Sequence, residues 1–157
     1  MKKIIFLITI SLFTLTASCG YKIVNQSELQ NFDISEITTT GDKKINYKLK
    51  NRLLFKSKKN VNQLITIKLD TIKSKIVKEK NIKNEITKYQ ITIEVTVSFN
   101  SVNANTSDQF VLTKNGDYAV AKKYSQTLNN EKKLIELLSN NLASEILDEL
   151  ILRVNDI

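Results

Sequence analysis

Residues 89–99 read YQITIEVTVSF, and they show the clearest structural pattern in the chain. Polar residues alternate here without interruption with six apolar ones, Tyr89, Ile91, Ile93, Val95, Val97 and Phe99. A period of two is typical of a β-strand with one buried face and one exposed face. Antiparallel sheets commonly have one solvated face of this kind. The stretch therefore predicts a long strand of a half-buried antiparallel sheet.

A second strand is predicted at residues 63–77. Ile65, Ile67 and Leu69 alternate there with polar residues, and the pattern continues through Ile72 toward Val77. We expect one face of this strand to join the core.

The first and fourth strands give weaker signals. Residues 32–40 form a short alternating run that places Phe32, Ile34 and Glu36 on one face. Residues 103–108 are rich in turn-forming residues. Residues 109–113 and 118–125 then predict a fourth strand, bent or divided at Asn115 and Gly116.

Two helices complete the pattern. After Gly41, Asp42 can cap a helix with apolar positions at Ile45, Leu49, Leu53 and Leu54 and a basic face of Lys44, Lys48, Lys50 and Arg52. A solvated face is the default explanation of those cations. A longer helix of roughly six turns is predicted to open at Asn130 and Glu131, with an apolar stripe that includes Leu134, Leu138, Leu142, Ile146 and Leu150.

This order of elements, β-α-β-β-β-α, defines the expected fold class. It predicts a single α+β domain over residues 32–157, with a mainly antiparallel four-stranded sheet and two helices packed on one face. The long helix is too polar on its outer face to enter a membrane, so we expect it to lie on the apolar face of the sheet.

The first 18 residues have the pattern of a secretory signal peptide. Lys2 and Lys3 precede an apolar run at residues 4–15, which is too short for a permanent membrane span. Residues 16–19, TASC, resemble the bacterial lipobox, in which small residues precede a cysteine that is acylated and becomes the new N-terminus. The alternative is an ordinary cleaved signal that contains a cysteine by chance.

Cys19 is the one cysteine of the chain. An unpaired thiol is a liability in an oxidising compartment, so we interpret Cys19 as a membrane anchor that carries acyl chains such as palmitate. Gly20 follows it, where many lipoproteins retained in the inner membrane have Asp. By resemblance to that sorting rule, we expect the outer membrane, on its periplasmic side. Residues 19–31 then form a lipidated tether.

The charge of the chain is basic. Its 24 Lys and Arg against 16 Asp and Glu give a formal net charge of +8, which becomes about +6 (22 − 16) without Lys2 and Lys3. Nucleic acid, anionic lipid or an acidic partner would suit this charge, and export excludes nucleic acid. An A+T-rich genome, which favours lysine codons, explains the same excess without any ligand.

Catalytic and metal-binding motifs are missing from the sequence. It has no histidine, and no HExxH or CxxC pattern. We therefore predict no metal site, no cofactor, no catalytic residues and no enzymatic activity. An all-carboxylate or Ser-Lys site stays possible, although no spacing suggests one.

The layout resembles that of LptE, the family of lipopolysaccharide-assembly lipoproteins. Three short motifs carry the resemblance: CGY at residues 19–21, LKNRL at residues 49–53 and KYQI at residues 88–91. The resemblance implies an outer-membrane lipoprotein that plugs the LptD β-barrel, assists its assembly and binds lipopolysaccharide during delivery to the outer leaflet. A periplasmic adaptor or regulatory lipoprotein that docks on a cell-envelope machine stays open as the alternative.

The same resemblance places lipopolysaccharide binding on basic residues of the loop before the long strand and of a site before the last helix. The candidates in the loop are Lys73, Lys75, Lys78, Lys80 and Lys83, and those before the helix are Lys122 and Lys123. Lysines bind the phosphates of lipid A as point charges. The alternative is that they keep a hairpin tip soluble and its edge unpaired.

Overall fold

The computed structural model describes residues 32–56, 63–101 and 106–155. Within these residues, four strands form one sheet: β1 (Phe32–Gly41), β2 (Gln63–Lys80), β3 (Ile86–Ser101) and β4 (Thr106–Ala119). Two helices accompany the sheet, α3 (Lys43–Lys56) after β1 and α4 (Tyr124–Asn155) after β4. The predicted α+β fold class and element order are confirmed. The predicted signal peptide and tether lie outside the described residues.

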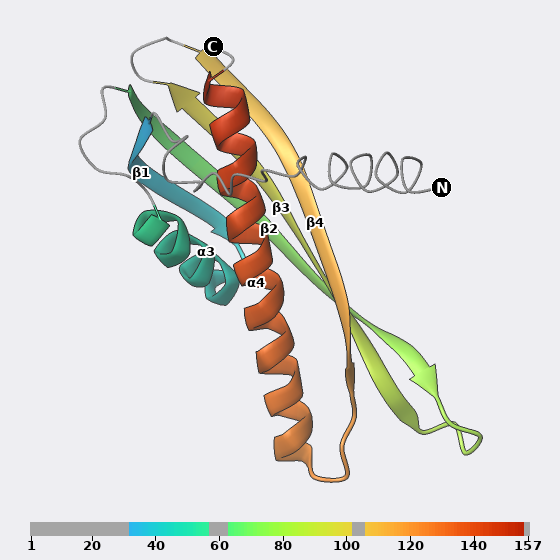
Figure 1. The fold of residues 1–157 in the computed structure, drawn as a ribbon. Coiled ribbons are helices and arrows are strands. Elements are labelled where there is room, and N and C mark those ends of the chain that lie inside the picture. The colour runs from blue at the N-terminus through green and yellow to red at the C-terminus, as the bar shows by residue number, and fades with distance from the viewer. Residues whose placement is uncertain (1–31, 57–62, 102–105, 156–157) are drawn as a thin grey trace, which may run out of the picture.

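The sheet is mixed, with strands in the order β1-β2-β3-β4. β1 and β2 are parallel because α3 connects them as a crossover, and the other two pairs are antiparallel. Both helices cover one face of the sheet, and the other face is open (Figure 1). The molecule therefore has two layers, with its core between helices and sheet.

The core contains the side chains that the sequence pattern predicted. Ile91, Ile93, Val95 and Val97 of β3 are fully buried. The apolar residues Ile65, Ile67 and Leu69 of β2 are buried as well. On the helices, the buried positions are Ile45, Leu49, Leu53, Leu138, Leu142, Ile146 and Leu150. A wide apolar stripe on α4 lies on β4 and β3, as expected for a helix on a half-buried sheet.

β1 departs from the predicted alternation. A β-bulge between Ile34 and Glu36 shifts its pairing with β2, so that Ile37 pairs with Ile67 and is buried. Glu36 is exposed and does not share the face of Ile34. The expectation for Glu36 was wrong because a bulge changes which face every later residue occupies.

β4 runs without a break through Asn115 and Gly116, where we expected a bend or division. Gly116 pairs with Ile91, and a Cβ atom at this glycine would lie 2.7 Å from Leu134 Cδ1 of α4. The glycine therefore allows the helix to approach the strand closely, and it forms no turn.

The segment after β4 also differs from the prediction. β4 ends at Ala119 and α4 begins at Tyr124, so residues 120–125 do not continue the strand. The opening turns of α4 contain exposed residues such as Tyr124, which hid the helix from an apolar periodicity. Thr127 accepts a hydrogen bond at Oγ1 from the backbone N–H of Ala121, which fixes the entry to the helix.

The turn from β1 to α3 is locked by polar contacts. Gly41 adopts a φ of 90°, and Asp42 caps α3 by accepting hydrogen bonds from the N–H groups of Lys44 and Ile45 at 3.0 and 3.1 Å. Behind the cap, the buried Asn46 and Thr71 are hydrogen-bonded to each other at 2.9 Å. These contacts fix α3 against the point where β1 ends beside β2.

Candidate binding surfaces: a basic hairpin and a polar sheet face

The β2–β3 hairpin is the most prominent surface feature. β1 pairs with β2 only as far as Thr71, and all residues from Ile72 to Lys80 are exposed. The end of this hairpin projects beyond β1 and α3 (Figure 1). The strand predicted to run to Val77 therefore continues to Lys80, and the connecting turn is only residues 81–85. Lys73, Lys75, Lys78 and Lys80, which we assigned to a loop, lie on β2.

The tip of the hairpin has a defined conformation. The Asn81 side chain accepts hydrogen bonds from the N–H groups of Lys83 and Glu85 at 2.9 and 3.0 Å. Asn84 takes a left-handed conformation with φ of 62°, which asparagine tolerates better than most residues. Ile82, between them, is fully exposed. The tip therefore presents an apolar side chain and lysines on an ordered turn.

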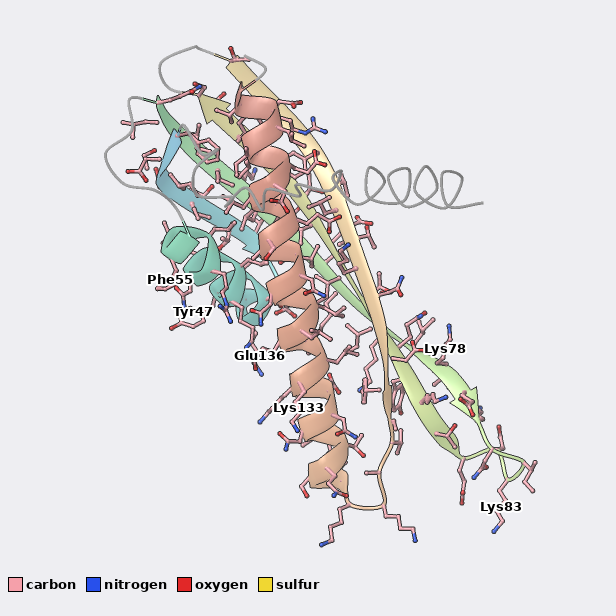
Figure 2. All side chains as sticks on the ribbon, in the orientation of Figure 1. Tyr47, Phe55, Lys78, Lys83, Lys133 and Glu136 are labelled. Atoms are coloured by element: carbon pink, nitrogen blue, oxygen red, sulfur yellow. The ribbon has the colours of Figure 1, made fainter. Side chains whose placement is uncertain are left out.

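Three candidate lysines belong to this end. Lys78 lies at the bulge between Val77 and Glu79, and Lys83 lies in the turn (Figure 2). Lys80 donates a hydrogen bond to Asn84 Oδ1 at 3.0 Å. Within the described residues, the ammonium groups of Lys78 and Lys83 have no ion-pair partner. They are therefore available to an anionic ligand.

Lys73 and Lys75 are exposed, but both form ion pairs with other residues of the molecule. Lys73 Nζ lies 3.4 Å from the carboxylate of Asp42, the residue that caps α3. Lys75 Nζ lies 2.8 Å from Glu131 Oε2 and 4.3 Å from the ring centroid of Tyr89. Both lysines point to the helix side of β2, because Thr71, Lys73 and Lys75 pair with the buried residues of β3. These two lysines therefore link β2 to the start of α3 and to α4 through their ion pairs.

The contacts among Lys75, Glu131 and Tyr118 change the pKa values of all three groups. Burial acts to lower the pKa of Lys75, but its hydrogen bonds and charge interactions with Glu131 and Tyr118 raise it above its usual range. Burial acts to raise the pKa of Glu131, but Lys75 and Tyr118 hold it below the usual value. Tyr118 completes the group by donating a hydrogen bond to Glu131 Oε2 at 2.8 Å.

Lys122 and Lys123 lie in the β4–α4 connection, at the same end of the sheet as the hairpin tip. The N–H of Val120 donates to the carbonyl of Thr87 at 2.8 Å, so this connection begins beside the base of the tip. Both lysines are exposed. The structure thus brings the two predicted basic sites to one end of the molecule, which we call the basic end.

The open face of the sheet is polar. It displays alternate residues of β2, β3 and β4, mainly Thr66, Lys68, Asp70, Thr92, Glu94, Thr96, Ser98, Gln109, Thr113 and Asn115. A shallow hollow of about 680 Å³ lies on this face where β1 to β4 meet, beside Glu36, Lys68 and Gln109. The face offers many hydrogen-bonding groups, and it also exposes three apolar side chains, Ile72, Ile76 and Val111.

Among the described residues, no group of acidic, cysteine or histidine side chains could hold a metal ion. No helix of that part of the chain is both long and apolar enough to cross a membrane. Cys19, the expected lipidation site, lies outside the described residues.

Sequence reasoning missed several features of the basic end. Ile82 at the tip was not singled out, because one apolar residue among lysines has no periodicity. The partners of Lys73 and Lys75 were also missed, because Glu131 lies 56 residues from Lys75 in the chain. The run of lysines in the sequence was the one feature that pointed to this surface.

Comparison with known proteins supports the fold. No protein-family model and no curated protein matches the chain. Rare lipoprotein B from Shewanella oneidensis has a similar structure, with a TM-score of 0.58 at 12% identity over 77% of this chain and 98% of that one. Lipoprotein B from Nitrosomonas europaea gives 0.57 at 13% identity over 87% and 94%, respectively.

A third structure extends the set. The minor lipoprotein from Acinetobacter baumannii matches with a TM-score of 0.50 at 13% identity, over 78% of this chain and 94% of that one. Each similarity covers nearly the whole of the solved lipoprotein. The chain therefore has the fold found in these bacterial lipoproteins.

Proposed function

We propose that the chain is an outer-membrane lipoprotein, anchored through acylated Cys19, that plugs an LptD-like β-barrel and binds lipopolysaccharide. The fold carries the proposal, because structures with this LptE-like fold are lipoproteins. The lipobox-like TASC at residues 16–19 and the three short motifs point to the same class. The role is binding and assembly, without enzymatic chemistry.

The open sheet face supplies the surface for a barrel. A plug must replace the water of a polar lumen with hydrogen bonds of its own. The Thr, Ser, Asn and Gln side chains of β2, β3 and β4 can provide them, and the underlying sheet is rigid. Assistance in barrel assembly would use the same surface.

The basic end supplies the surface for lipopolysaccharide. Lys78, Lys80 and Lys83 project on an ordered hairpin, and Lys122 and Lys123 lie beside its base. Anionic phosphates attract several lysines through additive contacts that salt screens. Because Lys73 and Lys75 are held in internal ion pairs, the proposal rests on the other five lysines.

The test is a titration with lipopolysaccharide from the host of this protein. Reversal of charge at Lys78, Lys80 and Lys83 together is expected to weaken binding at least tenfold, and binding by the natural chain is expected to fall as salt rises. Reversal at Lys68, Lys132 and Lys133, three exposed lysines outside the hairpin tip and the β4–α4 connection, makes an equal change in net charge and is the matched control. Circular dichroism checks that both variants are folded.

Equal binding by the folded hairpin variant and the natural chain would show that the lysines only keep the tip soluble. Mass spectrometry tests the anchor separately: we expect an acylated N-terminus at Cys19, and Cys19→Ala to release the protein from membranes. An unmodified mature N-terminus at another residue would disprove the lipoprotein assignment. A cell-envelope machine other than a large barrel, recovered as the partner, would favour the adaptor role.

A further inference from the structure

Helix α3 has a second apolar stripe that nothing in the described fold covers. Its buried stripe of Ile45, Leu49 and Leu53 packs on the sheet. On the opposite side, Tyr47 is 70% exposed, Phe55 is 85% exposed and Leu54 is 42% exposed. A surface helix needs one apolar stripe for its own core, so this outward stripe requires another explanation.

The charges of α3 all have one sign. Its sequence, KKINYKLKNRLLFK, contains no acidic residue. Lys43, Lys44 and Arg52 form no ion pair within the described part of the chain, and Lys48 reaches only Glu136 of α4, at 3.9 Å. The outward aromatic stripe is therefore flanked by cations. We call Lys44, Tyr47, Lys48, Asn51, Arg52 and Phe55 the α3 stripe.

The α3 stripe follows the turns of one helix and meets α4. Lys44, Lys48 and Arg52 are spaced by four residues, as are Tyr47, Asn51 and Phe55, so each set lies along one line of the helix. A shallow hollow of about 360 Å³ runs along them and reaches Glu136 and Asn140 of α4. Figure 2 shows Tyr47, Phe55, Glu136 and Lys133 along one side of the molecule.

We propose that the α3 stripe docks on the headgroups of an anionic phospholipid bilayer. Aromatic side chains favour the boundary between headgroups and acyl chains, and lysines and arginines beside them attract anionic lipid. Each cation near such a surface adds to the attraction. The occupant is thus a membrane surface on which the helix lies flat.

The position of the lipid anchor supports this orientation, and here the inference rests on one part of the proposed function, the acylated Cys19. The chain between Cys19 and Phe32 spans at most about 45 Å when fully extended. α3 is a crossover between the parallel strands β1 and β2, so Phe55, near its end, lies toward the end of the sheet where β1 begins. A membrane that holds Cys19 is therefore within reach of the α3 stripe.

The docked orientation also separates two basic surfaces. Phe55 of the α3 stripe and Lys83 of the hairpin tip lie at opposite sides of the molecule (Figure 2). Contact of α3 with the bilayer would therefore keep the hairpin tip away from that bilayer and free to meet lipopolysaccharide or a barrel.

The test uses the full lipidated protein bound to vesicles through its own anchor. Asn51→Cys places a fluorescent label within the α3 stripe and keeps both aromatic side chains. Thr113→Cys, on the open face of β4, is the matched control. Vesicles contain phosphatidylethanolamine with 30% phosphatidylglycerol, or phosphatidylcholine alone, and a small fraction of headgroup-labelled quencher lipid in both.

We expect at least threefold stronger quenching at position 51 than at position 113 on the anionic vesicles. On phosphatidylcholine, or after Lys44→Glu, Lys48→Glu and Arg52→Glu together, quenching at 51 is expected to fall to the level of 113. Equal quenching at both positions on anionic vesicles, or equal quenching at 51 on both lipids, would overturn the proposal. The comparisons between positions and between lipids use the natural charges of α3. They therefore test the proposal even if the triple variant does not fold.

Mass spectrometry of the same preparation separates the two proposals. If Cys19 is acylated and position 51 is unquenched, docking by α3 is wrong and the anchor is retained. If Cys19 is unacylated, the anchor fails and the membrane orientation fails with it. Lipopolysaccharide binding is measured independently through the hairpin lysines.

Discussion

At the scale of single residues, polar side chains decide where the elements of this fold meet. Asp42 caps α3 and also pairs with Lys73 of β2. Burial acts to raise the pKa of Asp42, but hydrogen bonds from backbone N–H groups and the charge of Lys73 hold it below its usual value. One carboxylate therefore joins the helix start to the neighbouring strand.

Gly41 is the residue of this turn that we expect to tolerate substitution least. Its φ is 90°, and a Cβ atom there would overlap the carbonyl oxygen of Thr71. Gly41→Ala is therefore expected to lower the free energy of unfolding by about 2–4 kcal/mol, measured by urea denaturation. Gly116→Ala is the control, because its Cβ would meet only the movable end of Leu134, and we expect a cost of about 1 kcal/mol or less. Equal costs at both glycines would contradict this explanation.

Glu131 gives a prediction with a defined pH dependence. Its pKa in the folded protein is lowered, so its contribution to stability is fully present above its unfolded pKa of about 4.3 and is lost as the pH falls through the folded value. Glu131→Gln is expected to destabilise the protein by about 1–2 kcal/mol at pH 7, because Lys75 loses its charged partner.

Denaturation curves at several pH values test this. Between about pH 5 and pH 3, the natural chain is expected to lose more stability than the Glu131→Gln variant, and the difference between them should shrink. Glu94→Gln, on the open face of the sheet, serves as the control and should follow the natural chain. A difference that is constant with pH would show that the Glu131 charge does not stabilise the fold.

At the scale of elements, the periodicity of β3 was sufficient to predict the core. Its six alternating apolar positions lie on the helix side of the sheet, and the stripe of α4 packs there. The bulge in β1 could not be predicted, because nothing in the residues around Ser35 distinguishes it from regular alternation. Gly116 was misread because a glycine that admits a helix and a glycine that forms a turn look the same in a sequence.

The candidate site was predicted only in part, because a sequence does not show which side chains meet in the fold. The lysine run located the hairpin, since a charged run is visible in the sequence itself. Which of its lysines are free depends on which strand face each one occupies and on Asp42 and Glu131, which are distant in the chain. The outward aromatic stripe of α3 was not predicted, because the exposure of its side chains follows only from how the helix packs.

Packing of α4 on the sheet gives a direct stability prediction. Leu142 is fully buried, so Leu142→Ala is expected to lower the free energy of unfolding by about 2–5 kcal/mol. Leu137→Ala on the same helix is the control, because Leu137 is 56% exposed and should change stability by less than about 1 kcal/mol. Similar values for the two variants would contradict the packing of α4.

At the scale of the whole molecule, three surfaces have separate chemistry. The helix side carries the aromatic and basic α3 stripe, the far side of the sheet is mostly polar, and the basic end projects beyond both. A protein held at a membrane by its N-terminus would use them for lipid, barrel and lipopolysaccharide, respectively. In the proposed function, this division gives the extended hairpin of a small, basic domain a role of its own.

Photo-crosslinking in living cells of the host tests the central claim, the plug role, most directly. A photoreactive residue at Thr113, on the open sheet face midway along the edge strand β4, is expected to crosslink to a very large outer-membrane β-barrel protein, identified by mass spectrometry. The same residue at Asn51 on α3, assigned to lipid, should give much less of that product. Crosslinks from Thr113 to a cell-wall synthase or another envelope protein, with no barrel among the products, would contradict the account.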